Sequence, residues 1–257
     1  MNLRTLDIFS GVGGFSLGME RAGLETVAFC ENEPFPRKVL AKYWPGVPCY
    51  EDVRTLTAER LAADGIAVDV ICGGFPCQDI SIAGKGRGLS GAKSGLWGEF
   101  RRLIDELRPA YAVIENSPKL RDRGLLAILT DLDALGYDAE WHCIPASHVG
   151  APHRRDRIWI IAYRQGDTLG SDADSLGPHS PSLHLYRSAE LRDQQVRDFG
   201  QMAWWRTEPD VERVVDGPPT RMDIDRIRVV GNAVVSDIPE LIGHAILASL
   251  EMGSRSA

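Results

Sequence analysis

Short apolar runs alternate with amphipathic segments over the first two-thirds of the chain. The runs have the length of buried strands, and the segments between them show the i, i+3 and i+4 spacing of helices. Strands are expected at residues 3–9, 26–30, 68–72, 110–115, 138–144 and 156–162, and helices at 15–22, 35–43, 98–107 and 125–135. This alternation predicts an α/β fold in which a parallel sheet carries helices on both faces.

The pattern breaks after residue 162. The following stretch is rich in Ser, Asp, Gly, Pro and His without sustained periodicity, and an apolar helix returns at residues 238–250. We therefore expect a first domain at 1–162, an irregular insertion at 163–226, and a segment at 227–257 that returns to the first domain.

Composition and charge add limits to this picture. No apolar run is long enough to cross a bilayer and the start lacks a signal-peptide core, which predicts a cytoplasmic location. The five cysteines form no Cys-x-x-Cys pair, so no metal site is expected. The net charge of −7 is unusual for a nucleic-acid enzyme, although basic clusters at 119–123 and 154–157 could form a local basic surface.

A glycine-rich turn, Phe-Ser-Gly-Val-Gly-Gly at residues 9–14, ends the first expected strand and opens the first helix. Glycines allow a ligand to approach the backbone, and a helix N-terminus offers free N–H groups. The spacing differs from the Gly-x-Gly-x-x-Gly of dinucleotide sites, which favours another nucleoside-type cofactor. Glu31, roughly twenty positions on, could bind ribose hydroxyls. Asp52 could bind an adenine amino group, although either acid alone is typical of a solvated surface.

Two residues after later strands suggest chemistry. Cys77 follows a Gly-Gly-Phe-Pro turn that would hold its thiol exposed, which makes it a candidate nucleophile, although a lone cysteine is more often buried. Glu115 ends an apolar strand, where a charge indicates proton transfer or a specific hydrogen bond. A helix cap by Asn116 or Ser117 is the alternative, but it does not account for Glu115.

Arg155 and Arg157 stand two apart at the start of the last expected strand, which predicts that they share a face. Two adjacent guanidinium groups indicate a shared anion such as a phosphate or carboxylate. A pair of solvated surface arginines is the alternative.

In order and spacing, these segments resemble the DNA cytosine-5 methyltransferase family over residues 3–162 and 230–243. The resemblance implies a Rossmann-like, S-adenosyl-L-methionine-dependent methyltransferase sheet with a small target-recognition insertion. It implies that Cys77 attacks carbon 6 of a flipped cytosine and that Glu115 contacts N3 of the base. Arg155 and Arg157 would hold the base and its backbone. Glu115 would have to carry a proton near neutral pH, so its pKa is expected to be raised.

The resemblance also implies a cofactor site, partners and a mobile lid at residues 84–97. The S-adenosylmethionine site would contain Phe9, Ser10, Gly11, Gly13, Gly14, Glu31, Asp52, Val53, Pro76, Asn232 and Ala233. The partner would be double-stranded DNA, bound by a monomer, and a separately encoded restriction endonuclease is a candidate second partner. His153, Ser117 and Asn32 depart from the residues usual in the family.

Three other functions stay open at this point. An RNA cytosine-5 methyltransferase of the same lineage would carry the same motifs up to Arg157. A catalytically silent nucleic-acid-binding regulator could keep the fold, but intact Cys77, Glu115 and both arginines argue against it. A nucleotide-binding oxidoreductase is disfavoured by the glycine spacing.

Overall fold

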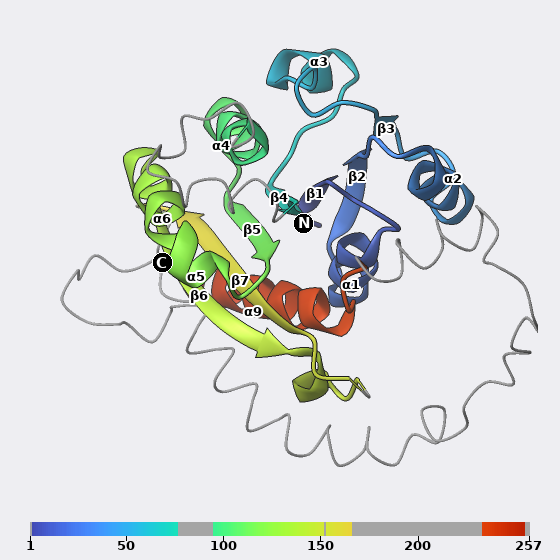
Figure 1. The fold of residues 1–257 in the computed structure, drawn as a ribbon. Coiled ribbons are helices and arrows are strands. Elements are labelled where there is room, and N and C mark those ends of the chain that lie inside the picture. Colours follow the sequence, from blue (N-terminus) through green and yellow to red (C-terminus); the bar gives the residue numbers. More distant parts are fainter. Residues whose placement is uncertain (1, 77–94, 152, 166–232, 255–257) are drawn as a thin grey trace, which may run out of the picture.

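A seven-stranded sheet forms the centre of the computed structural model, which describes residues 2–76, 95–151, 153–165 and 233–254 (Figure 1). The strand order is β3-β2-β1-β4-β5-β7-β6. The strands are β1 (Arg4–Ile8), β2 (Glu25–Cys30), β3 (Cys49–Tyr50), β4 (Val70–Gly74), β5 (Tyr111–Asn116), β6 (Tyr137–Pro145) and β7 (Asp156–Arg164). Each expected strand is therefore present, and β3 is an addition that is too short to show periodicity.

The direction of β7 corrects the prediction of a uniformly parallel sheet. Strands β1 to β5 pair in parallel, whereas β7 runs antiparallel to both β5 and β6. The connection from β6 to β7 spans residues 146–155, and its described part contains a short 3-10 helix, η3 (Ala146–Val149). A parallel neighbour needs a longer crossover, so this short connection turns the chain back.

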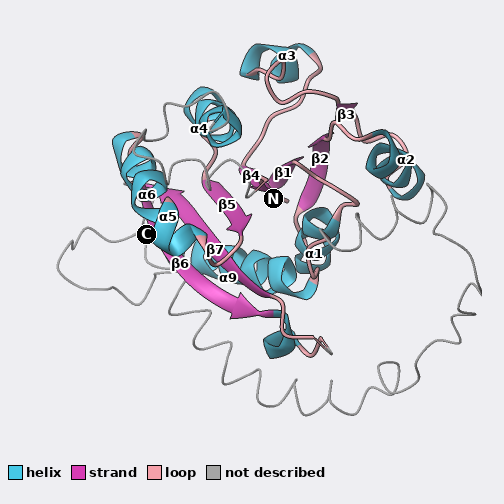
Figure 2. Ribbon diagram, viewed as in Figure 1, coloured by secondary structure: helices cyan, strands magenta, loops and turns pink. Residues whose placement is uncertain are grey.

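Helices cover both faces of the sheet, as expected (Figure 2). They are α1 (Gly14–Ala22), α2 (Pro34–Tyr43), α3 (Ala58–Ala63), α4 (Gly95–Leu107), α5 (Leu120–Arg123), α6 (Leu125–Ala134) and α9 (Asp237–Ser254). Helices α3 and α5 were not expected, because four to six residues are too few to show a helical period. None of the helices in the described ranges is long and apolar enough to span a membrane.

Two apolar layers hold the helices on the sheet. On one face Leu61 of α3, Phe100 of α4 and Ile128 of α6 are buried against the strands. On the other face Met19 of α1 and Ile242 of α9 are buried. Each large apolar side chain buried in this way contributes about 1.5–3 kcal/mol. The sheet is thus fixed from both sides, and its carboxyl edge is left for other contacts.

Glycine allows α1 and the C-terminal segment to approach closely, and the two lie side by side in Figure 1. A Cβ atom on Gly18 would lie 2.2 Å from the carbonyl oxygen of Ser236, and one on Gly243 would lie 2.6 Å from Cβ of Ala22. Larger residues at either position would push the two helices apart. This packing holds the C-terminal segment against α1.

The predicted insertion falls almost wholly outside the described residues. Strand β7 continues to Arg164, two residues beyond the expected boundary, and residues 166–232 are not described. The predicted lid at 84–97 lies outside as well, except for the residues that begin α4.

Candidate active site

The glycine turn after β1 has the backbone geometry that its sequence predicts. Phe9, Gly11 and Gly13 have φ angles of 55°, 54° and 83°. This left-handed region is readily adopted by glycine and strained for most other residues. A Cβ atom on Gly11 would meet no atom of the described residues within 4 Å, so the turn is open toward them on that side. The ring of Phe9 lies on the α4 side, 6.4 Å from the ring centroid of Phe100.

Glu31 lies against this turn. Its Oε2 accepts a hydrogen bond from the backbone nitrogen of Gly11 at 2.8 Å, and its Oε1 accepts one from the nitrogen of Glu33 at 2.7 Å. The side chain is buried at the end of β2. Carboxylate oxygens can each accept a further hydrogen bond, so Glu31 can hold the turn and still bind a hydroxyl group.

Ser10 has a role that its sequence context did not indicate. Its hydroxyl donates to the carbonyl oxygen of Asp7 at 2.6 Å and accepts from the nitrogen of Cys30 at 3.2 Å. The hydroxyl therefore fastens the end of β1 to the end of β2. Ser10, one of the predicted cofactor residues, therefore helps to fix the shape of the glycine turn through these backbone contacts.

The C-terminal segment reaches the start of α1, and two further predicted cofactor residues follow β3. A Cβ atom on Gly14 would lie 2.7 Å from the carbonyl oxygen of Val234, the residue that follows Ala233 in the sequence. Asn232 lies outside the described residues. Asp52 accepts from the nitrogen of Arg54 at 2.9 Å, and its side chain is partly exposed, whereas Val53 is buried in the core.

Glu115 is the buried acidic residue among the predicted catalytic residues that the structure describes. It stands at the end of β5, between Gly74 of β4 and Trp159 of β7. Its side chain is 12% exposed, and its Oε1 lies 2.7 Å from Nε of Arg157. Burial raises the pKa of Glu115 above its ordinary value, and the opposing charges of Arg157 and Arg155 reduce that rise. The direction of the shift agrees with the sequence-based expectation.

The two arginines are arranged differently from the prediction. Only Arg157 belongs to β7, which begins at Asp156, and Arg155 precedes the strand with a φ of 25°. The prediction of two alternate strand positions on one face is therefore wrong for Arg155. Burial and the nearby charge of Arg157 lower the pKa of Arg155, and Glu115 opposes that effect. The chain itself thus supplies an anionic partner, Glu115, to Arg157.

Cys77 lies outside the described residues, but Phe75 and Pro76, which precede it in the sequence, are described. Phe75 is buried and Pro76 is exposed at the end of β4. The amide of Asn116 donates from Nδ2 to the carbonyl oxygen of Phe75 at 2.9 Å, and Asn116 is 2% exposed. Asn116 therefore fastens the ends of β4 and β5 together, a contact that sequence reasoning missed because the partner is a distant backbone group.

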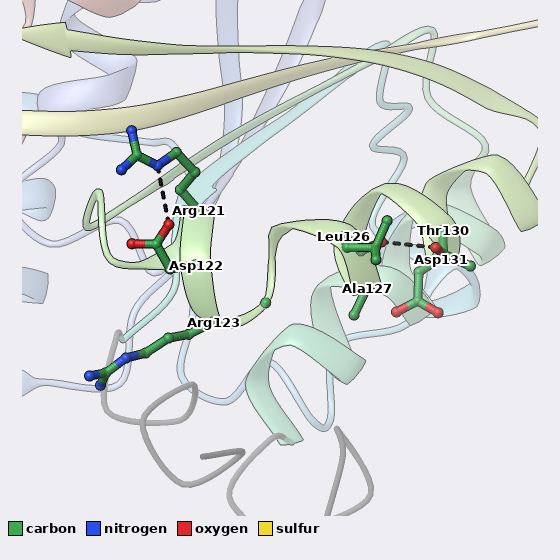
Figure 3. Close-up of a pocket in the computed structure, with 8 residues that line it drawn as sticks. Arg121, Asp122, Arg123, Leu126, Ala127, Thr130 and Asp131 are labelled. Carbon is green, nitrogen blue, oxygen red and sulfur yellow. Dashed lines mark hydrogen bonds and ion pairs between the residues drawn. The ribbon is translucent and has the colours of Figure 1, made fainter. Parts of the chain in front are cut away.

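An open hollow of about 550 Å³ lies along α5 and α6 (Figure 3). Several of its polar side chains have partners within the chain. Nε of Arg121 lies 3.3 Å from Oδ1 of Asp122, the hydroxyl of Thr130 donates to the carbonyl oxygen of Leu126, and Asp131 accepts from Trp97. None of the predicted site residues lines this hollow.

Comparisons with known proteins place this architecture in a family. The model for C-5 cytosine-specific DNA methylase matches residues 3–198. The type II methyltransferase M2.BsuMI of Bacillus subtilis is 33% identical over 168 residues, which cover 62% of this chain and 42% of that protein. The chain thus spans less than half the length of this relative.

Solved structures agree with the fold. A protein described as a DNA modification methyltransferase, encoded within an Escherichia coli prophage, aligns with a TM-score of 0.56 at 29% identity, covering 66% of this chain and 49% of that one. The methyltransferase EhMeth of Entamoeba histolytica aligns over 97% of this chain and 99% of its own, with a TM-score of 0.64 at 13% identity, which supports the fold alone. Because the family model matches residues 3–198, which is most of this chain, the chain belongs to the C-5 cytosine-specific DNA methylase family.

Proposed function

We propose that this chain is a DNA (cytosine-5-)-methyltransferase that modifies carbon 5 of a flipped cytosine through a covalent adduct at Cys77. The observation that carries the proposal is the position of Glu115. The buried carboxyl group of Glu115, whose pKa is raised, lies at the carboxyl edge of the sheet, over Gly74. Gly74 in turn stands three positions before Cys77 in the sequence. Family membership supplies the class of reaction.

The chemistry explains why both residues are needed. Carbon 5 of cytosine is a poor nucleophile because the ring is aromatic. The thiolate of Cys77 adds to carbon 6, and a proton from Glu115 at N3 neutralises the charge that develops, which leaves an enamine at carbon 5. After carbon 5 has been methylated, a base removes the carbon-5 proton and the thiolate is expelled. N3 returns its proton to Glu115, which restores the neutral aromatic ring.

The residues around the glycine turn fit S-adenosylmethionine. This cofactor supplies an electrophilic methyl group on a sulfonium. The open side of Gly11 leaves room for a ligand at the turn. Glu31 would bind the ribose hydroxyls, Asp52 the adenine amino group, and Phe9 would lie against the adenine. The helix α1 begins here, so its N-terminus faces the same region.

The proposed substrate is double-stranded DNA, bound by a monomer in the cytoplasm. Carbon 6 lies inside the base stack, so the base has to rotate out before Cys77 can reach it. Arg155 and Arg157 would hold the flipped base and its backbone. Side chains of residues 163–226 would choose the DNA sequence by reading base edges. A separately encoded restriction endonuclease is the proposed second partner.

Radiolabelled S-adenosylmethionine tests the proposal directly. The wild type is incubated with duplex DNA or with RNA, beside Cys77→Ser and the control Cys143→Ser, which changes an exposed cysteine of β6. We expect labelled DNA with the wild type and the control and none with Cys77→Ser. DNA containing 5-fluorocytosine should trap the wild type covalently, because fluorine cannot leave as a cation. Labelled RNA alone, or equal labelling by Cys77→Ser, would contradict the proposal.

A further inference from the structure

A contact across two strands places the Glu115 carboxylate over a glycine. Gly74 of β4 is paired in register with Glu115 of β5. A Cβ atom on Gly74 would lie 2.5 Å from Oε2 of Glu115, whereas the next nearest atoms are 3.6 Å away. A real Cβ atom does not approach an oxygen so closely. The carboxylate oxygen therefore occupies the space that any other residue at position 74 would fill with its side chain.

The second oxygen of the same carboxylate is held by an ion pair. Nε of Arg157 lies 2.7 Å from Oε1. The carboxylate is thus fixed between a guanidinium group and the bare backbone of Gly74. If a methyl group were added at position 74, Oε2 would have to move, and the geometry of the Arg157 pair would change with it.

The strand below the carboxylate has little freedom to relieve such a clash. In the residue after Gly74, the carbonyl oxygen of Phe75 accepts a hydrogen bond from Asn116 at 2.9 Å. In the residue before it, a Cβ atom on Gly73 would lie 2.2 Å from the carbonyl oxygen of Ile8, so β4 is packed tightly against β1 there. The carboxylate, rather than the backbone, is the group that would be displaced.

We propose that Gly74 is a positioning residue for Glu115. Its missing side chain keeps Oε2 over the strand end that leads to Cys77, while Arg157 holds Oε1. The catalytic consequence rests on the proposed function, because it assumes that Glu115 delivers the proton to the base. The placement of the carboxylate is a property of the fold and can be measured separately.

A double-mutant cycle of Gly74→Ala and Glu115→Ala tests the placement without any enzymatic assay. Overpacking typically raises the unfolding equilibrium constant roughly 5- to 150-fold, and we expect the lower end of that range here because the atom that must move ends a side chain. In urea unfolding we expect that rise for Gly74→Ala in the wild-type background and most of it to vanish beside Glu115→Ala. Gly98→Ala is the matched control, because a Cβ atom on that exposed glycine of α4 meets no described atom within 4 Å. Equal effects of Gly74→Ala in both backgrounds would overturn the proposal.

Methyl transfer to duplex DNA then tests the consequence. A small displacement of a reacting group costs on the order of 100-fold in rate, so Gly74→Ala should lower kcat by about that factor and leave S-adenosylmethionine binding unchanged. Beside Glu115→Ala it should lower kcat no further. A decrease of the same size in the Glu115→Ala background would show that Gly74 acts through another group. If the wild type transfers no methyl group at all, the proposed function fails, and the unfolding cycle alone decides whether Gly74 places the carboxylate.

Discussion

Arg157 reaches Glu115 because β7 runs antiparallel to β5. Asn116, next to Glu115 at the end of β5, is paired with Ile158 near the start of β7. The start of an antiparallel strand lies at the edge where its parallel neighbours end, so Nε of Arg157 comes within 2.7 Å of Oε1 of Glu115. A parallel β7 would have placed both arginines at the opposite edge of the sheet. The one reversed strand therefore completes the site.

Removal of Arg157 should destabilise the protein and raise the pKa of Glu115 further. Burial already raises that pKa, and Arg157 is the largest influence opposing it. Loss of a hydrogen bond between charged groups costs about 2 kcal/mol, which urea unfolding of Arg157→Ala would measure. The control Arg154→Ala removes a side chain that is 84% exposed and should change stability by less than about 0.5 kcal/mol. Equal losses for the two variants would argue against the pairing of Arg157 with Glu115.

The buried carboxyl of Asp7 should make stability depend on pH. Asp7 is fully buried, and its Oδ2 accepts from the hydroxyl of Ser16 at 2.8 Å. Burial raises the pKa of Asp7 to about 8. A carboxyl whose pKa is raised by folding stabilises the folded state at low pH, and that contribution is lost as the pH rises from about 4 towards 8.

Replacement of Asp7 by Asn should remove this loss. Relative to the wild type, Asp7→Asn should gain stability between pH 5 and pH 8.5, on the order of 3–5 kcal/mol in urea unfolding. A difference between Asp7→Asn and the wild type that stays constant with pH would mean that Asp7 does not hold its proton in the folded state.

The sequence predicted those parts of the site that follow from strand ends. Phe9, Glu31 and Glu115 each lie at the end of an apolar run, and parallel strands bring such ends to one edge. The direction of β7 was not predictable, because an apolar run looks the same in either direction. The functions of Ser10 and Gly74 depend on atoms that lie across neighbouring strands, so no local pattern could indicate them.

Asn116 should matter for stability and for activity. Its Nδ2 donates to the carbonyl oxygen of Phe75 and its Oδ1 accepts from the nitrogen of Ser117 at 2.8 Å, with the side chain buried. Asn116→Ala leaves these buried backbone groups without partners, which costs about 1–3 kcal/mol. It also frees the strand end that leads to Cys77, so methyl transfer should decrease.

Urea unfolding and radiolabelled methyl transfer would measure both effects. Gln165→Ala is a suitable control, because that exposed amide pairs only with the surface carboxylate of Asp138 among the interactions described. It should leave both quantities close to wild type. If Asn116→Ala is as stable and as active as that control, the bond to Phe75 has no part in shaping the site.

The contact between α1 and the C-terminal segment should link stability to cofactor binding. A Cβ atom on Gly18 would lie 2.2 Å from the carbonyl oxygen of Ser236 and 2.8 Å from the nitrogen of Glu240. Because both are backbone atoms, Gly18→Ala should displace the segment and cost about 1–3 kcal/mol. The same segment lies over Gly14 at the start of α1.

S-adenosylmethionine binding, measured by calorimetry, should therefore weaken in Gly18→Ala. The control Gly23→Asn, at the other end of α1, should bind S-adenosylmethionine as the wild type does. Unchanged binding by a destabilised Gly18→Ala protein would separate the C-terminal segment from the cofactor site and leave it a purely structural support.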